Sequence, residues 1–204
     1  MLSYSESLKI LKETKALVEG HFILSSGLHS DKYIQCAKLL SQPSKSVIIC
    51  SSLCDKIRKN FKTIDLILSP AIGGIVVGYE VGKQLGKETI FAERVGGKLQ
   101  LRRGFKILPN SNVLVVEDVI TTGKSALECF ELIKIYKSQL VGFACIIDRS
   151  TENNLINEKI VSQIKLKIDT YSEESLPDSL KKIQPIKPGS RDLSKWKTKD
   201  LELI

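Results

Sequence analysis

One thirteen-residue run, residues 113–125, sets the strongest limit on how this chain folds. It begins Val-Leu-Val-Val, an uninterrupted aliphatic stretch typical of a strand that is covered on both faces in a parallel sheet. Glu117 and Asp118 follow at once, and a short turn containing Gly123 leads into an amphipathic segment over 126–136. Because ligands bind beyond the carboxyl ends of strands in such sheets, the run predicts a strand, a polar ligand edge and a helix in immediate succession.

The turn after the acidic pair has the chemistry of a phosphate site. A helix N-terminus offers free N–H groups to an anion, Gly123 lets the backbone approach it closely, and the threonine and serine hydroxyls of the turn can donate to phosphate oxygens. Glu117 and Asp118 would repel a phosphate, so their expected partners are sugar hydroxyls or a hydrated Mg²⁺ that arrives with the ligand. The run therefore predicts a site for a ribose 5-phosphate.

Two alternatives exist for the same run. Any doubly wound α/β protein contains strand–turn–helix units, in which an acidic pair can simply cap the helix. The letters Gly-Lys-Ser at 123–125 also match the end of the P-loop of nucleotide triphosphatases. That motif requires a glycine where this chain has Asp118, and a carboxylate there would face the bound phosphates.

Length and composition restrict the remaining classes of protein. The 204 residues fit one domain with a substantial core and a small appended lobe. No stretch of about 18 apolar residues is present and the N-terminus lacks a signal-peptide pattern, so we expect a cytoplasmic protein without a membrane segment. The cysteines lack the spacing of a metal site, and we expect all five to be reduced and buried. They are Cys36, Cys50, Cys54, Cys129 and Cys145.

The net charge of +8 raises the question of a nucleic-acid partner. The lysines and arginines are spread along the chain and lack the aromatic residues that alternate with them in a single-strand binding surface. Part of the excess lies in Arg94, Lys98, Arg102 and Arg103, where a polyanionic small molecule would also need cations. We therefore expect no nucleic-acid partner.

Hydrophobic periodicity predicts the elements outside the central run. We expect helices over 5–18 and from Pro43 to about Asn60, with two short strands at 22–24 and 32–35 between them. Strands and helices then alternate, with strands at 64–68, 89–91, 113–116, 141–147 and 165–170, helices at 75–85 and 126–136, and a short helix before a polar tail. This order predicts an α/β fold with a central, mostly parallel sheet flanked by helices. We predict a single domain over 1–204, with a core of about 45–165 and a small cap formed by the N-terminal segment (about 1–44) and the C-terminal segment (166–204).

Three further segments carry candidate chemistry. The turn Ser-Pro-Ala-Ile-Gly-Gly at 69–74 can point backbone N–H groups at a pyrophosphate, although glycine there can also serve the turn geometry alone. Residues 94–105 are basic and glycine-bearing, which favours a mobile loop, either a lid or a solvated connection. Arg149 directly follows the predicted strand 141–147, so its guanidinium can bind a carboxylate or pair locally with Asp148.

Taken together, these motifs resemble those of the orotate phosphoribosyltransferases, which are type I phosphoribosyltransferases. The run at 113–125 is similar to the signature that binds phosphoribosyl pyrophosphate (PRPP), and segments at 22–33, 91–94, 101–105, 148–149 and 187–191 match in the expected order. The resemblance implies the type I phosphoribosyltransferase fold and Mg²⁺-dependent transfer of the phosphoribosyl group to orotate. The products would be orotidine 5′-monophosphate and pyrophosphate, in pyrimidine synthesis. It also implies a homodimer in which the basic loop acts in the neighbouring subunit.

The resemblance assigns roles to individual residues. It implies catalytic roles for Lys98, Arg102 and Asp118. The implied PRPP-binding residues are Ile72, Gly73, Arg94, Lys98, Arg103, Glu117, Asp118, Val119, Ile120, Thr121, Thr122, Gly123, Lys124 and Ser125. The implied orotate contacts are Thr121, Arg149 and Ser26. No metal site formed by the protein is implied, since PRPP itself would hold most of the Mg²⁺.

The chain departs from the family pattern at several positions. Ser25 and Gly73 stand where many members carry lysine, and residues 94–105 lack the histidine that is often present. Lys124 stands where glycine is common and either contacts phosphate or points to solvent, while His21 and His29 are interpreted as structural or surface residues.

Two other functions fit the same motifs. One is a purine or uracil phosphoribosyltransferase, in which Arg149 would have no carboxylate to bind. The other is a PRPP-sensing regulator that binds nucleic acid, although the first sixty residues show no clear helix-turn-helix pattern.

Overall fold

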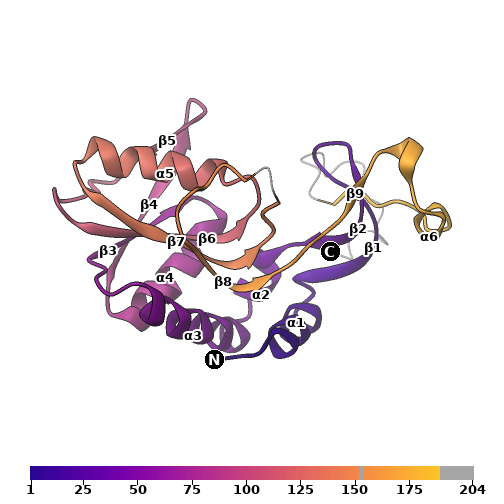
Figure 1. Ribbon diagram of the computed structural model, residues 1–204, viewed down its shortest axis with the longest axis horizontal. Coiled ribbons are helices and arrows are strands. Elements are labelled where there is room, and N and C mark those ends of the chain that lie inside the picture. The colour runs from indigo at the N-terminus through magenta and orange to yellow at the C-terminus, as the bar shows by residue number, and fades with distance from the viewer. Residues whose placement is uncertain (152–153, 189–204) are drawn as a thin grey trace.

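The computed structural model describes residues 1–151 and 154–188, which form an α/β body and a smaller cap (Figure 1). The body contains a six-stranded sheet in the order β5-β4-β3-β6-β7-β8. Its strands are β3 (Leu66–Pro70), β4 (Glu88–Val95), β5 (Lys98–Leu101), β6 (Asn112–Ile120), β7 (Gln139–Asp148) and β8 (Ile160–Lys165). All neighbours are parallel except β5, which runs antiparallel to β4. The predicted mostly parallel sheet is confirmed.

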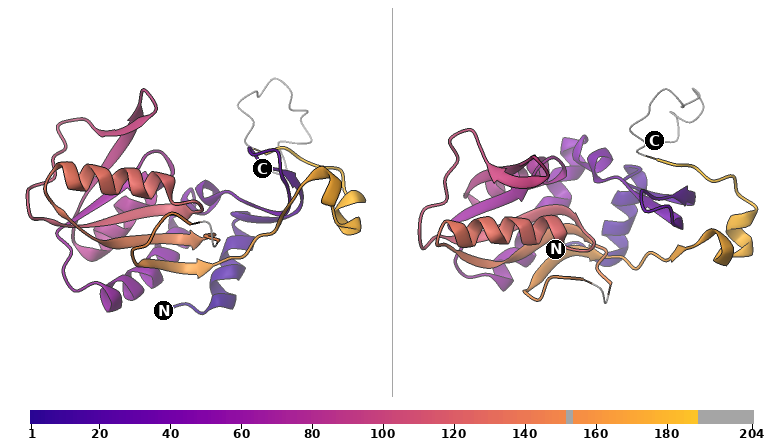
Figure 2. Two further views of the ribbon diagram at one scale, coloured as in Figure 1. Left: turned by 45° about the horizontal axis from the view of Figure 1, so that its top comes forward. Right: turned by 90° about the horizontal axis from the view of Figure 1, so that it is seen from above.

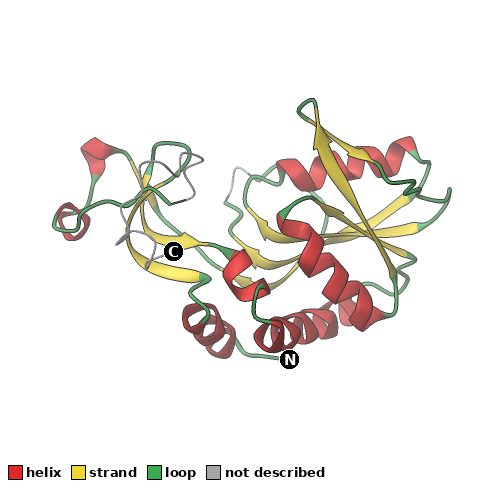
Figure 3. Cartoon of the chain, turned by 180° about the vertical axis from the view of Figure 1, so that it is seen from behind, coloured by secondary structure: helices red, strands yellow, loops and turns green. Residues whose placement is uncertain are grey.

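Helices cover both faces of this sheet. On one face lie α3 (Pro43–Asn60) and α4 (Gly73–Leu85), and on the other lies α5 (Lys124–Ile135), as seen from behind in Figure 3. The side chains of β6 alternate between the two layers. Leu114 packs with the α3 and α4 side, whereas Val115 packs with the α5 side. This explains why residues 113–116 are apolar at every position.

The cap is a three-stranded sheet in the order β1-β2-β9, formed by β1 (Leu17–Ile23), β2 (His29–Ile34) and β9 (Thr170–Tyr171). The C-terminal segment adds a parallel bridge at Ile186, whose N–H donates to His21 O (2.8 Å). His21 and His29 are buried and hydrogen-bonded through Nε2 and Nδ1 (2.7 Å), and His21 Nδ1 lies 2.9 Å from Ile183 O. Their contacts agree with the predicted structural role.

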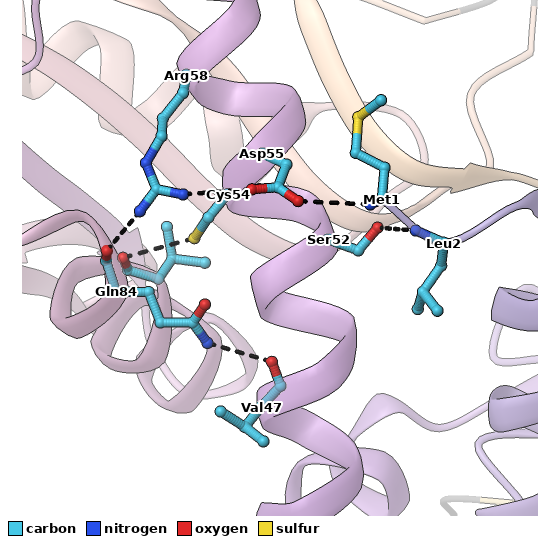
Figure 4. A network of polar contacts seen from close by, with 9 residues as sticks. Met1, Leu2, Val47, Ser52, Cys54, Asp55, Arg58 and Gln84 are labelled. Atoms are coloured by element: carbon cyan, nitrogen blue, oxygen red, sulfur yellow. Dashed lines mark hydrogen bonds and ion pairs between the residues drawn. The ribbon is translucent and has the colours of Figure 1, made fainter.

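Short helices complete the described residues. They are α1 (Tyr4–Glu13), α2 (Cys36–Leu40), the 3-10 helix η1 (Glu173–Ser175) and α6 (Asp178–Lys181). Side chains of helix α3 bind the first two residues of the chain and also contact helix α4 (Figure 4). The Met1 ammonium lies 3.5 Å from Asp55 Oδ2, and Arg58 donates to Gln84 O (2.7 Å). No helix among the described residues is long and apolar enough to cross a membrane. All five cysteines are free and buried, as predicted.

Three sequence predictions need correction. The first helix ends at Glu13 rather than at 18, because residues 17–18 pair with Ile34 and Tyr33 as the start of β1. The strand predicted at 165–170 is wrong, since β8 ends at Lys165 and Thr170 belongs to the cap sheet. Strand β6 continues to Ile120, so the acidic pair lies within the strand rather than after it.

The basic segment 94–105, predicted as a mobile loop, contains regular structure. Its first half is a hairpin of β4 and β5, in which Val95 pairs with Lys98 around Gly96 and Gly97. Both glycines have positive φ (56° and 83°), as a two-residue hairpin turn of the primed type requires. Figure 2 shows this hairpin extending away from the rest of the body.

Candidate active site

Three turns meet at one edge of the main sheet. They follow the parallel strands β3, β6 and β7, which are direct neighbours, so their carboxyl ends lie side by side. The cap lies beyond this edge (Figure 2). All three segments that the sequence singled out at 69–74, 117–125 and 148–149 are therefore brought together.

The acidic pair and the first glycine turn are in direct contact. A Cβ built on Gly73 would lie 2.8 Å from both carboxylate oxygens of Asp118. A lysine at position 73, the residue that many family members carry there, would require Asp118 to move. Because these atoms are the end of a flexible side chain, a rotation of Asp118 would relieve the contact, and the contact alone does not explain the glycine.

Burial shifts the acidity of both carboxyl groups. It raises the pKa of Glu117 from its usual value of 4.5 to about 8, with a further contribution from the charge of Asp118. Burial also raises the pKa of Asp118, although two backbone N–H groups oppose that shift. Neither side chain has a cation in an ion pair among the described residues. Hydroxyl donors or a cation from a ligand would stabilise the charged forms.

The turn after β6 leaves backbone donors free. Gly123 has φ 79°, and α5 begins at Lys124 without a side-chain cap. A Cβ on Gly123 would lie 2.6 Å from Ile156 Cγ1, so both the backbone and the packing require glycine. Helix α4 likewise begins without a side-chain cap, after Ile72. Two helix N-termini thus offer N–H groups to anions at the same edge.

The other residues predicted in this turn differ in what they can offer. Thr121, Thr122 and Lys124 are exposed, and Ser125 is half-buried at the first turn of α5. Ile120 is buried, and its carbonyl accepts the Arg149 N–H (2.8 Å), while Val119 packs against the core of the α3 and α4 face. Side chains at 119 and 120 therefore serve packing, and only their backbone can contact a ligand.

Arg149 has an unsatisfied guanidinium. Its Nε is buried without a hydrogen-bond partner among the described residues, and burial lowers its pKa. The side chain lines a cleft of about 850 Å³ together with Ser150 and Lys165. Asp148 does not pair with it; that carboxylate accepts the Ser150 N–H (2.8 Å) and lies 3.5 Å from Lys165 Nζ. The local Asp148–Arg149 ion pair that the sequence left open is therefore absent.

Ser26, the third predicted orotate contact, lies in the exposed turn of the cap between β1 and β2. Its hydroxyl accepts the Leu28 N–H at 3.4 Å. In the part of the chain that the structure describes, no hydrogen bond joins it to Thr121 or Arg149. The predicted segment 187–191 lies outside the described residues beyond position 188.

The basic segment 94–105 carries four cations, Arg94, Lys98, Arg102 and Arg103, which are called the hairpin cations below. They fall into two pairs. Arg94 Nη1 donates to Gly97 O (2.6 Å) and lies 2.8 Å from Glu128 Oε2 on α5. Arg103 makes two hydrogen bonds to Glu93 (2.9 and 3.0 Å). Lys98 and Arg102 are exposed, and their side chains make no hydrogen bond or ion pair with residues 1–151 or 154–188. Only the second pair is immediately available to a ligand.

Two of these partners, Glu128 and Lys165, were not predicted from the sequence. Glu128 occupies an ordinary helix-surface position, and Lys165 meets Asp148 only through the register of β7 and β8. Neither position has a local sequence signal. Among the described residues, no group of three or more His, Cys, Asp or Glu side chains is placed to hold a metal ion.

This edge combines an acidic pair with two helix N-termini that lack side-chain caps, which are groups suited to a sugar phosphate, and comparison with known proteins shows the family of the chain. Residues 38–177 match the phosphoribosyl transferase domain family, and the chain belongs to that family. It is 45% identical over 191 residues to an orotate phosphoribosyltransferase of Methylorubrum populi, covering 93% of this chain and 97% of that protein. The predicted resemblance to orotate phosphoribosyltransferases is thereby confirmed.

Solved structures confirm the predicted fold class. An orotate phosphoribosyltransferase of Aeropyrum pernix superposes with a TM-score of 0.68 at 24% identity, covering 78% of this chain and 92% of that one. An adenine phosphoribosyltransferase of Thermoanaerobacter pseudethanolicus gives 0.57 at 18% identity, covering 66% and 88%. Because proteins named for different bases share the fold, the fold alone does not decide which base this chain uses.

Proposed function

We propose that this chain transfers the 5-phosphoribosyl group of PRPP to orotate, forming orotidine 5′-monophosphate and pyrophosphate in pyrimidine synthesis. The observation that carries the choice of base is Arg149, a guanidinium with a buried, unpartnered Nε at the end of the strand next to β6. Orotate carries a carboxylate, which a guanidinium binds with two hydrogen bonds. Adenine, hypoxanthine and uracil carry none.

Each part of the edge then has one task in the reaction. Glu117 and Asp118 accept hydrogen bonds from the ribose hydroxyls, and the turn at 119–125 binds the 5-phosphate through backbone N–H groups. The N-terminus of α4 faces the pyrophosphate. The bond from C1 of the ribose to pyrophosphate breaks as the ring nitrogen of orotate bonds to C1; the electron pair leaves with the pyrophosphate, and the proton of that N–H passes to the departing pyrophosphate or to water. The hairpin cations stabilise that departing charge, with Lys98 and Arg102 the leading candidates.

The residues present fit a Mg²⁺ ion shared with the ligand. The acidic pair has two carboxyl groups with raised pKa values and no protein cation, and Mg²⁺ prefers oxygen donors and retains water and phosphate ligands. Mg²⁺ bound to PRPP would neutralise part of the pyrophosphate charge. Glu117 and Asp118 would hold its water shell or the hydroxyls beside it.

A homodimer is part of the same proposal. Helix α4 presents an exposed apolar stripe at i, i+4 and i+7, formed by Ile72 (86% exposed), Val76 (48%) and Tyr79 (66%). The stripe begins at the pyrophosphate turn, so a second copy covering it would bring its own residues close to the site. The hairpin of one copy would then act in the other, and a monomer would be nearly inactive. The cytoplasmic location inferred from the sequence stays a prediction.

A base panel tests the proposal. Purified protein with PRPP and Mg²⁺ is offered orotate, adenine, hypoxanthine, guanine or uracil, and loss of base and release of pyrophosphate are measured. Only orotate should be consumed, and only when PRPP and Mg²⁺ are both present. Turnover of a purine or uracil without turnover of orotate would overturn the assignment.

A further inference from the structure

A buried carboxylate, that of Asp148, belongs to the residue directly before Arg149, whose guanidinium we assign to orotate. The side chain of Asp148 is 7% exposed, and its Oδ1 accepts the Ser150 N–H (2.8 Å). Its Oδ2 lies 3.5 Å from Nζ of Lys165, which occupies the paired position on β8. The Leu166 N–H donates to Asp148 O (2.8 Å), so the backbone holds the two strands in this register.

The neighbouring Arg149 is fixed through its backbone but not through its side chain. Its N–H donates to Ile120 O, whereas its guanidinium makes no hydrogen bond or ion pair with the described residues. A buried carboxylate without a cation is costly, and the guanidinium one residue away is the nearest alternative partner along the chain. If Asp148 bound Arg149, the orotate carboxylate would have to displace it.

We propose that Lys165 is a positioning residue for the reaction: it pairs with Asp148 and thereby keeps the Arg149 guanidinium free for the carboxylate of the base. The inference rests on the proposed function, because it assumes that Arg149 binds orotate. Lys165 would act through Asp148 and would not itself touch orotate.

The chain offers a matched control for charge. Lys167 lies at the rim of the same cleft, two residues further on, but its side chain is 90% exposed and pairs with Asp169 (4.0 Å). It takes part in no step of the proposed reaction. Replacing Lys165 or Lys167 removes the same charge from the cleft, but only the first releases Asp148.

The first experiment compares Lys165→Met, Lys165→Gln, Lys165→Arg and Lys167→Met in steady-state kinetics. We expect both neutral replacements at 165 to raise the KM for orotate on the order of tenfold, with the KM for PRPP within about twofold of wild type. Lys165→Arg should restore the orotate KM, and Lys167→Met should leave it within about twofold. An unchanged orotate KM in both neutral variants would overturn the inference.

The second experiment separates a positioning role from direct contact. In the double variant Asp148→Asn/Lys165→Met, the amide oxygen still accepts the Ser150 N–H but no charge competes for Arg149. We expect its orotate KM to return to within about twofold of that of Asp148→Asn alone. If it stays as high as in Lys165→Met, then Lys165 contacts the base directly and the inference is wrong. The Kd of orotidine 5′-monophosphate, measured by calorimetry, should rise and recover in the same variants as the orotate KM.

The same kinetic data distinguish a failure of this inference from a failure of the proposed function. Wild-type protein that consumes no orotate would contradict the function itself. Wild-type activity on orotate with no response to the loss of Lys165 would contradict only the positioning role.

Discussion

The proposed ribose-phosphate end of the site and the proposed base end are built on different plans. Residues 117–125 supply the first from a single stretch of chain, with backbone N–H groups and two carboxyls as the contact groups. The base end combines Arg149 after β7, Lys165 on β8 and the turn of the cap that carries Ser26. One end is local and depends on the backbone, whereas the other depends on strand register and on side chains.

This difference has a functional consequence. A backbone cradle binds any ligand with the same sugar phosphate, and it suits the part of the substrate that is common to all members of the family. Side chains that converge from separate elements can change one at a time, and they suit the part that distinguishes one base from another. Substitutions at the two ends should therefore separate PRPP binding from base binding.

The largest expected effect is at the backbone cradle. Gly123→Ala should lower kcat/KM for PRPP by about 100-fold or more, because the new Cβ meets Ile156 at 2.6 Å and φ is 79°. Gly86→Ala is the matched control, since Gly86 also has positive φ (66°) but open space around its Cβ position. It should cost about 1 kcal/mol of stability and leave kcat/KM unchanged. Equal losses of activity in the two variants would contradict the cradle.

The next effect belongs to the base end. Arg149→Ala should raise the KM for orotate about 30-fold or more while the KM for PRPP changes less than about threefold, because only the base loses a charged partner. Steady-state kinetics with each substrate varied in turn measures both values. Arg149→Lys should recover part of the affinity, as it keeps the charge without the two-pronged geometry. A similar rise in both KM values would mean that Arg149 does not distinguish base from PRPP.

The two plans also explain how far the sequence could predict the site. The proposed ribose-phosphate end lies in one run, so Glu117, Asp118 and Gly123 could be proposed as a group from the amino-acid sequence alone, and their position at one edge of the sheet agrees with the predicted strand and turn. The end of β6 was misplaced because Val119 and Ile120 are β-branched and pair with β7, which no turn signal within the run indicates. That error placed the end of the strand at Val116 instead of Ile120, but it left the acidic pair at the same edge of the sheet.

The base end could be predicted only in part. Arg149 could be proposed because it follows an apolar strand, but the ion pair between Asp148 and Lys165 arises from the pairing of β7 with β8, and these two residues lie seventeen positions apart in the sequence. The hairpin of β4 and β5 was missed because β5 spans only Lys98–Leu101, too short for alternation to be recognised beside its charged neighbours. Contacts that arise from register leave no local pattern.

A pH series tests the acidic pair. The folded protein holds the Glu117 proton up to a pKa of about 8, whereas the unfolded chain releases it near 4.5. Between these values the folded state binds more protons, so stability should fall as pH rises from about 5 to 8. Thermal unfolding at pH 6 and at pH 8 measures this loss of stability. In Glu117→Gln, the difference in stability between the two pH values should be smaller than in wild type. Glu93→Gln is the control, because the pKa of Glu93 is lowered by Arg103 and this group does not titrate in that range. An unaltered slope in Glu117→Gln would contradict the proposed burial of an uncompensated carboxyl.

The smallest expected effect concerns the β4–β5 hairpin. Its cations are part of neither the ribose-phosphate end nor the base end until a ligand is bound. Arg94 pairs with Glu128 in the free protein and must leave it to reach PRPP. Both side chains are partly exposed, so the pair is worth only about 0.2–1 kcal/mol. Glu128→Gln should therefore lower the KM for PRPP about twofold and change the unfolding temperature little. Glu131→Gln removes a comparable carboxylate from the same helix, where it pairs with Lys134 rather than with the hairpin, and should change neither. A rise in the PRPP KM for Glu128→Gln alone would show the reverse relation, in which Glu128 holds Arg94 ready for the ligand. The hairpin would then be pre-organised like the backbone cradle instead of being recruited by PRPP.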